Sequence, residues 1–435
     1  MTAQAKIPLP SSRAAEAAPS AGARHTLFMG IFPTLTNRWT VLALLCFARI
    51  TLGFQFQAPA AVAPMLMDDL GLNYGRLGVL IGIFLLPGVF LALPGGLIGD
   101  RLGDKPVVLT GLAMMVLGAL LLAHSTSFTM ALAGRLCSGT GNVLLNVQFT
   151  KITTDWFAGR EIATAMALLL TTWPLGLAIS LTFLGAAATT MGWQGAITLT
   201  AAYALLGLLL VALLYGGTPA GQARPLQKQP LQKQRLWQIT RGELALAIAA
   251  GLVWMLYNDS FIVFLSFAPA LLISGGATVA VAGFVVALAS WISQGSVPLG
   301  GVLTDRTGRF NTFILAGTLV CALAIWWLPL GGPALAGVIV LGVAFGAPPG
   351  AIMALPSQVL RPASRGTGLG VFYTTFYVGT AVLLPVAGYL QDRTGSADTS
   401  LVFAGLLMLL AAGALLVFRL LQRRLAAGRP ESDRT

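Results

Sequence analysis

Three ionisable side chains lie deep inside long apolar segments of this sequence. Arg49 and Arg135 stand in two of these segments, and Asp259 follows Asn258 in a third. An ionisable group near the centre of a bilayer costs roughly 2.5–3.5 kcal/mol or more, so such residues are functional candidates. An arginine presents a planar fork of donors that suits a carboxylate or another oxyanion. A carboxyl whose surroundings tune its protonation can carry a proton. These residue types predict a site that binds an anion and handles a proton.

The segment around Arg135 places its polar residues on one helix face. Arg135, Gly139, Asn142 and Asn146 recur at steps of 4, 3 and 4 residues, the spacing of one side of an α-helix. We predict that this face lines a central cavity. Arg135 would contact the substrate and take part in proton coupling, with Asn142 and Asn146 as further substrate ligands. The alternative is a packing face, on which the polar groups bond neighbouring helices.

Arg49 and Asp259 each allow two interpretations. Arg49 is followed by Gly53 and Gln57 at successive helical turns. We predict that Arg49 and Gln57 contact the anion, although a structural arginine bonded to backbone carbonyls, or one snorkelling to the membrane surface, has the same sequence. We predict that Asp259 carries the coupled proton. Its alternative is a structural carboxylate that caps a helix break or pairs with an arginine.

Aromatic and amide side chains suggest further contacts with a solute. Tyr373 and Tyr377 are one helical turn apart, as are Trp254 and Asn258, and all four are candidate substrate ligands. Such residues also serve ordinary helix packing. The segment 346–350 reads Gly-Ala-Pro-Pro-Gly and predicts a break in its span, which is tolerated where irregular backbone is buried or lines a cavity.

The composition is that of an all-α membrane protein. Hydrophobic residues make up 56% of the chain and charged residues 9%, whereas soluble domains carry roughly 25% charged residues. The mean hydropathy is +0.83, and apolar runs longer than roughly 18 residues recur along the chain. We predict twelve transmembrane helices, at 41–66, 77–98, 106–124, 128–150, 164–188, 194–215, 244–273, 280–303, 311–330, 334–357, 367–390 and 399–421.

The distribution of basic residues sets the expected topology. With the N-terminus in the cytoplasm, 22 of the 26 basic residues fall on the cytoplasmic side, the exceptions being Arg49, Arg76, Arg135 and Arg393. This asymmetry predicts cytoplasmic termini in a bacterial-type inner membrane, and it explains the net charge of +12 without nucleic acid. The expected parts are a tail (1–40), a six-helix bundle (41–215), a cytoplasmic linker (216–243), a second bundle (244–421) and a tail (422–435).

A short charged motif appears twice. The first copy runs from Gly96 to Lys105 and the second from Gly301 to Arg309, and their aspartates, Asp100 and Asp305, lie 305 − 100 = 205 residues apart. The repeat predicts two similar membrane halves, the architecture of a secondary transporter. We expect the loops to act in switching between conformations, through Gly96, Asp100, Arg101, Gly103, Gly301, Asp305, Arg306, Gly308 and Arg309. The alternative is a pair of ordinary loops that fix topology.

These motifs resemble the major facilitator superfamily over about residues 41–421. The charged loop is similar to the family's Gly-x-Leu-x-Asp-Arg-x-Gly-basic-basic signature, from which Asp104 departs. Residues 135–141 resemble its Arg-x-x-x-Gly-x-Gly pattern, and 156–161 resemble the loop between its fourth and fifth spans. The resemblance implies two six-helix bundles related by pseudo-two-fold symmetry. Residues 172–177 match the Gly-Pro-x-x-Gly-Gly pattern of drug antiporters poorly, and the chain is most similar to cyanate permease-like and related anion carriers.

We therefore expect a secondary active transporter, acting as a monomer by alternating access. Symport of a small anion with protons is the favoured mode, and an anion exchanger or facilitator, a drug or metabolite exporter and a non-transporting solute sensor are the alternatives. No enzymatic activity, cofactor or metal is expected, because His25 and His124 stand apart from the cysteines and the sequence carries no nucleotide-binding P-loop.

Overall fold

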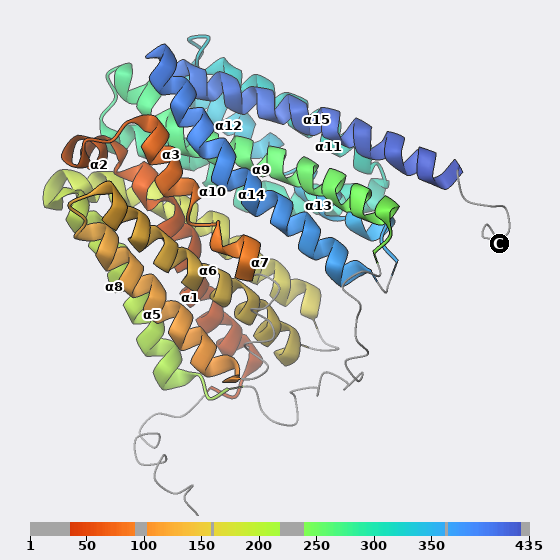
Figure 1. Cartoon of the computed structure of the whole chain (residues 1–435), viewed down its shortest axis with the longest axis horizontal. Coiled ribbons are helices and arrows are strands. Elements are labelled where there is room, and N and C mark those ends of the chain that lie inside the picture. Colours follow the sequence, from red (N-terminus) through yellow and green to blue (C-terminus); the bar gives the residue numbers. More distant parts are fainter. Residues whose placement is uncertain (1–34, 92–101, 158–160, 218–238, 362–363, 428–435) are drawn as a thin grey trace, which may run out of the picture.

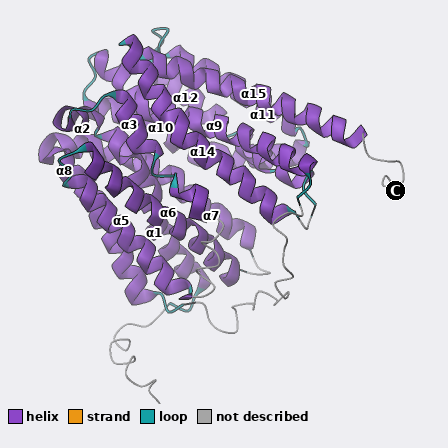
Figure 2. Cartoon of the chain, viewed as in Figure 1, coloured by secondary structure: helices purple, strands orange, loops and turns teal. Residues whose placement is uncertain are grey.

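The computed structural model describes residues 35–91, 102–157, 161–217, 239–361 and 364–427. Within these ranges the regular structure consists of helices alone (Figure 2). The first half contains α1 (Arg38–Ala61), α2 (Ala63–Leu70), α3 (Tyr74–Gly82), α5 (Asp104–Ala123), α6 (Phe128–Trp156), α7 (Ile162–Ile179), the π-helix η1 (Ser180–Leu184) and α8 (Gly185–Leu214). The second half contains α9 (Arg241–Ser274), α10 (Val279–Thr307), α11 (Phe310–Trp327), α12 (Ala334–Ala344), α13 (Pro348–Met353), the 3-10 helix η2 (Pro356–Gln358), α14 (Arg365–Thr394) and α15 (Asp398–Ala427).

These helices cross the membrane twelve times. Ten helical segments are long and apolar enough to do so, and one of them, Thr164–Leu214, has 51 residues and holds two spans. The two are separated at Gly192, where φ is 75° and ψ is 165°, a conformation that glycine adopts readily. The ten segments therefore account for eleven spans, and the 29-residue α6 supplies the twelfth. The predicted fold class is confirmed.

The helices form two bundles that meet at one end (Figure 1). The first bundle, red to yellow-green, holds α1 to α8, and the second, green to blue, holds α9 to α15. We call the end at which α8 ends and α9 begins the linker end, and the opposite one the far end. The bundles touch along α3 and α14 and along α7, η1 and α10. Toward the linker end they diverge (Figure 1).

Backbones approach closely where the bundles touch near the far end. A Cβ atom added at Gly388 of α14 would lie 2.0 Å from the Tyr74 carbonyl of α3, and one at Gly283 of α10 would lie 2.5 Å from the Leu181 carbonyl of η1. Only glycine permits this spacing. The sequence therefore specifies tight contact between the halves at this end.

Several predicted boundaries were wrong by one or two helical turns. The first span ends at Ala61 rather than at 66, because the backbone leaves the helix at Val62 and starts α2. The eighth span continues to Thr307 rather than ending at 303, and Gly308 ends it in a left-handed conformation with φ 65°. Residues 304–307 of the second motif copy, which lay beyond the predicted span, are therefore helical.

Candidate functional site

Arg49 lies on α1 between helices of its own bundle and faces the other one. Its Nη1 donates to the Leu169 carbonyl (2.6 Å) and to the Thr172 hydroxyl (2.9 Å) of α7, and its Nη2 donates to Asn146 Oδ1 of α6 (2.8 Å). The residue is only 4% exposed, and its Nε has no hydrogen-bond partner among the described residues. No carboxylate of the described chain pairs with it, so a buried positive charge stands here without a protein counter-ion.

Two tyrosines of α14 approach this arginine from the second bundle. Tyr373 and Tyr377 both lie close enough to Arg49 for electrostatic interaction, and Tyr377 also approaches the amide of Asn146. Tyr373 is 36% exposed, although it lies in the first third of α14 and near Arg49 of the other half. The structure brings together Arg49, Asn146, Tyr373 and Tyr377, four of the predicted substrate ligands.

Gln57 and Asn142 are buried and have no described hydrogen bond to that cluster. Gln57 of α1 donates from Nε2 to the Ser266 hydroxyl of α9 at 3.4 Å, a contact between the two halves, while its Oε1 has no partner in the described part of the chain. The Oδ1 atom of Asn142 is likewise buried without a described partner. Buried polar atoms without a hydrogen-bond partner are uncommon inside proteins, so these two oxygens indicate a place for water or a polar ligand.

Arg135 uses its guanidinium to hold helices together. Its Nε donates to the Leu80 carbonyl (2.7 Å), its Nη1 to Gln55 (2.6 Å), and its Nη2 to Phe56 (3.0 Å) and Ile81 (3.4 Å). The guanidinium also lies over the ring of Phe84, 4.4 Å from its centroid. These contacts join α6 to α1 and to the α3 segment, and they favour the packing interpretation of Arg135. A role in substrate or proton binding stays a prediction.

Asp259 belongs to α9, faces α14 and is fully buried. Its Oδ1 is 2.5 Å from the hydroxyl of Thr380, and its Oδ2 has no partner among the described residues. No described arginine or lysine forms an ion pair with it. The alternative of a carboxylate paired with an arginine therefore has no support in the described structure. Its neighbour Asn258 donates to the Trp254 carbonyl one turn earlier, at 2.9 Å.

The predicted break in the tenth span is present. α12 ends at Ala344 and α13 begins at Pro348. The hydroxyl of Tyr257 on α9 donates to the carbonyl of Phe345, which the break releases from the helical pattern. A side chain thus satisfies the irregular backbone, as a break inside a membrane requires. Tyr257 was not among the predicted site residues, and its place inside an apolar helix gave no signal of this partner.

The two motif copies are described unequally. Gly96, Asp100 and Arg101 lie outside the described residues, while Gly103 precedes α5 with φ 83°. Asp104, the departure from the family signature, accepts a bond from Lys151 of α6 at 3.0 Å. In the second copy Asp305, Arg306, Gly308 and Arg309 are exposed at the linker end, and Gly301 is half-buried.

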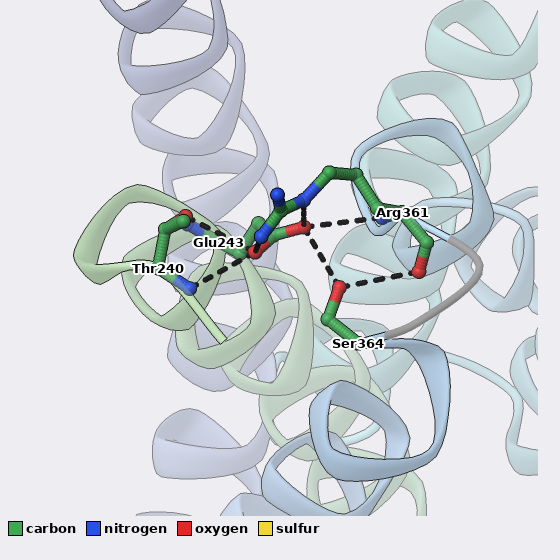
Figure 3. Close-up of polar contacts among 4 residues, drawn as sticks. All are labelled: Thr240, Glu243, Arg361 and Ser364. Carbon is green, nitrogen blue, oxygen red and sulfur yellow. Dashed lines mark hydrogen bonds and ion pairs between the residues drawn. The ribbon is translucent and has the colours of Figure 1, made fainter. Parts of the chain in front are cut away.

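A dense polar cluster fixes the linker end of the second bundle (Figure 3). Glu243, 5% exposed at its side chain, accepts bonds from Arg361 Nε (2.9 Å) and Nη2 (3.0 Å) and from the Ser364 hydroxyl (2.7 Å). It also caps α9 by accepting from the backbone N–H of Thr240 at 2.9 Å. The hydrogen bond to Glu243 raises the pKa of the Arg361 guanidinium above its ordinary value.

The first bundle has a counterpart of this cluster with the charges exchanged. Arg38, the first residue of α1, donates to Glu161 at the start of α7 at 2.8 Å. Arg38 and Glu243 lie 243 − 38 = 205 residues apart, the same separation as the two motif aspartates. Each bundle therefore ties its first span to the segment before its fifth span by an ion pair. The charge exchange hides this correspondence from a search for identical residues.

Comparison with known proteins places the chain in a family of transporters. The sequence profile described as Major Facilitator Superfamily matches residues 45–384. The 3-(3-hydroxy-phenyl)propionate transporter of Escherichia coli is 27% identical over 390 residues, which are 87% of this chain and 93% of that protein. The probable sulfoacetate transporter SauU of Cupriavidus necator is 24% identical over 402 residues, with 86% and 92% covered. The lysosomal dipeptide transporter MFSD1 of Danio rerio is 25% identical over 388 residues, with 83% and 82% covered.

Solved structures show the same fold. A bacterial homolog of the human lysosomal transporter Spinster, in an inward-facing and unoccupied conformation, superimposes with a TM-score of 0.73 at 18% identity, covering 92% of this chain and 100% of that one. The inward-open xylose transporter XylE from E. coli gives 0.71 at 14% identity, covering 88% and 96%.

Proposed function

Because this chain belongs to the Major Facilitator Superfamily, and is thus a multi-pass membrane transporter rather than an enzyme, we propose that it moves a small organic anion together with protons. The observation that carries the proposal is Arg49, a buried guanidinium of the first bundle that lies near two tyrosines of the second. Its Nε has no partner and it has no protein counter-ion among the described residues. A buried charge is costly unless it is paired. An anion bound here supplies the missing partner.

The position of Arg49 also connects binding to movement. The anion binds to Arg49 and Asn146 on the first bundle and to Tyr373 and Tyr377 on the second. Arg135, Gln57, Asn142, Trp254 and Asn258 stay further candidates for the path of the solute. A solute that bonds both halves stabilises states in which they approach each other, which is the differential affinity that alternating access needs.

Alternating access here is a rocking of 41–215 against 244–421. Contact at the far end and divergence at the linker end support an inward-facing state of the protein (Figure 1). In this proposal the linker end and both termini face the cytoplasm of a bacterial-type inner membrane. The two superimposed transporters are described as inward-facing and inward-open, which agrees with this orientation.

Asp259 carries the proton. The hydroxyl of Thr380 has one hydrogen to donate and two oxygen atoms within hydrogen-bond distance. Asp259 Oδ1 lies at 2.5 Å and the Phe376 carbonyl at 3.1 Å. If the hydroxyl donates to the carbonyl, the carboxyl must donate to the hydroxyl, and Asp259 is then protonated. The absence of a described cation partner supports that form. A proton that accompanies the anion offsets the membrane potential, which opposes anion entry by about 2.3 kcal/mol per charge per 100 mV.

The cargo of two relatives supports the anion. Their names specify 3-(3-hydroxy-phenyl)propionate and sulfoacetate, both of them acid anions. We propose a carboxylate or sulfonate of this size class as the substrate, with Arg49 binding the acid group.

Uptake into proteoliposomes tests the proposal. The panel contains 3-(3-hydroxyphenyl)propionate, sulfoacetate, benzoate and the neutral amide of benzoate, each with and without an inward proton gradient. We expect gradient-driven accumulation of at least one anion and none of the amide. Uptake that depends on an internal anion but not on the gradient would identify an exchanger and remove Asp259 from the mechanism. Transport of the amide with none of the anions would refute the role of Arg49.

Two variants assign the groups. Arg49→Gln should abolish anion uptake, while Arg49→Lys keeps the charge and retains part of it. Asp259→Asn should lose accumulation driven by the proton gradient but keep anion exchange. Full proton coupling in Asp259→Asn protein would exclude Asp259 as the proton carrier.

A further inference from the structure

At the far end a single carboxylate joins the two bundles. Asp392, near the end of α14, accepts hydrogen bonds from two backbone N–H groups at the start of α3, from Tyr74 to Oδ1 at 2.9 Å and from Gly75 to Oδ2 at 2.7 Å. Both oxygens of the carboxylate are used, and both donors belong to the other half of the molecule. This contact crosses the boundary along which the bundles must separate for the far end to open.

The carboxylate completes the N-terminal cap of α3. The first four N–H groups of a helix, counted from its N-cap residue, have no partner within the helix. In α3 the N-cap residue is Asn73, whose side chain accepts from the N–H of Arg76. The N–H groups of Tyr74 and Gly75 bond Asp392. One capping bond thus comes from the same bundle and two come from the opposite one, and separation removes only those two.

The sequence around Asp392 is a further copy of the charged motif. Residues 388–395 read Gly-Tyr-Leu-Gln-Asp-Arg-Thr-Gly, and residues 301–308 read Gly-Val-Leu-Thr-Asp-Arg-Thr-Gly, so the two segments share Gly, Leu, Asp, Arg, Thr and Gly in register. The sequence repeat at 205 residues did not reveal this copy, because it follows the fifth span of its bundle and lies at the opposite membrane face.

The two helix ends also have the same local structure. Gly308 and Gly395 each end their helix with φ 65°. The hydroxyl groups of Thr307 and Thr394 each donate four residues back, to Leu303 and Leu390, at 2.8 and 3.0 Å. The aspartates differ: Asp305 is exposed at the linker end, where the bundles diverge, with no described hydrogen bond or ion pair, whereas Asp392 bonds the opposite bundle where they touch.

We propose that Asp392 is the latch that keeps the far end closed. The inference rests on the alternating access proposed above. The negative carboxylate binds the positive end of the α3 dipole and two free N–H groups across the boundary. When the far end opens, Tyr74 and Gly75 exchange this partner for water. Loss of one capping side chain changes an equilibrium by about tenfold, so Asp392 shifts the balance between the far-closed and far-open states by this factor.

Distance measurements between spin labels test the latch. One pair, at Asp68 and Leu330, reports the far end, and a second, at Thr154 and Thr307, reports the linker end; all four positions are exposed. The three free cysteines are first replaced by alanine. In this background Asp392→Ala, which removes both acceptors, should raise the ratio of far-open to far-closed molecules about tenfold. Asp392→Asn, which removes the charge but keeps one neutral acceptor, should have a smaller effect and serves if the alanine variant does not fold.

Two controls separate the latch from general damage. Asn73→Ala removes the capping bond to Arg76, which lies within one bundle, and Asp398→Asn removes a charge at the start of α15 whose described bonds are local, to Ser396. Neither should change the far-end distances. An unchanged far end in both Asp392 variants would overturn the latch, as would an equal opening in Asn73→Ala. If the far end opens while the linker-end pair keeps its distance, the latch holds and alternating access fails.

Discussion

The two buried arginines should separate into one that binds the anion and one that supports the fold. Arg135→Gln loses at least three of four carbonyl hydrogen bonds, because a glutamine amide cannot reproduce the fork. Hydrogen bonds between transmembrane helices contribute about 0.6–2 kcal/mol each, so the variant should lose about 2–6 kcal/mol. A native protein is stable by about 5–15 kcal/mol. Much of the stability of the fold therefore depends on this residue.

Arg49→Gln should behave in the opposite way. The wild-type guanidinium bonds only one carbonyl, that of Leu169, beside the side chains of Thr172 and Asn146, and Asn146 is only half-buried and can turn to water. We expect a loss of about 1–3 kcal/mol in stability and a fall of at least tenfold in affinity for the anion, or 1.4 kcal/mol. Arg135→Gln molecules that remain folded should bind within about threefold of the wild type, since their guanidinium donors already serve carbonyls.

Thermal unfolding and equilibrium binding of the anion identified by uptake, on the same detergent preparations, check both expectations. The double variant shows whether the two effects add, as they should for independent sites. A wild-type unfolding midpoint in Arg135→Gln protein with weakened binding would refute the assignment. It would instead restore the prediction that Arg135 contacts the substrate.

Three further predictions concern other contacts. Arg361→Gln should lower the unfolding midpoint more than Glu243→Gln, because it leaves the buried Glu243 carboxylate without its cation. Glu243→Gln leaves only the Arg361 guanidinium unpaired, and water reaches that group. The reverse order of midpoints would contradict this account of the cluster. Thr380→Val should alter the pH profile of uptake while Thr380→Ser preserves it, and equal profiles in uptake assays would remove the hydroxyl from proton handling. Gly53→Ala should cost about 1–3 kcal/mol in thermal unfolding, because its Cβ would lie 2.2 Å from the Trp173 carbonyl. Gly295→Ala, with nothing within 4 Å, is its control and should be neutral.

The fold was predictable because the membrane imposes it. A chain in lipid must satisfy its backbone within helices, so apolar runs and the repeated motif were sufficient for the architecture. Helix ends were less predictable, since they depend on single residues such as Val62 and Gly308 rather than on hydropathy. The break at Gly346 could be predicted from its glycines and prolines, but Tyr257 as its partner could not, because that contact joins residues 88 apart.

The site could be predicted only in part, for a related reason. Arg49 and Arg135 have the same sequence signal, an arginine inside an apolar run, and only their partners distinguish them. All four described hydrogen bonds of Arg135 go to helix carbonyls, whereas Arg49 has one carbonyl partner, Leu169, and two side-chain partners. Those partners come from helices far apart in sequence. Asp392 was missed because it lies just beyond the predicted eleventh span, 367–390, and outside the pair of copies at matching positions.

One helix connects the proposed substrate, proton and latch contacts. α14 carries Tyr373 and Tyr377 opposite Arg49, Thr380 bonded to Asp259, and Asp392 on the cap of α3. From Tyr377 to Asp392 is 15 residues, or about 22 Å of helix. A helix moves as a unit except where it bends, and Pro385 is the one proline inside α14. An anion that draws the tyrosines toward Arg49 therefore also pulls on the cap at the far end, through a segment with one place to bend.

If Pro385→Ala stiffens that segment, opening of the far end should follow anion binding more closely. Spin-label distances at Asp68 and Leu330, measured with and without the anion, would then respond more strongly than in the wild type, and a weaker response would mean that the two ends of α14 move independently.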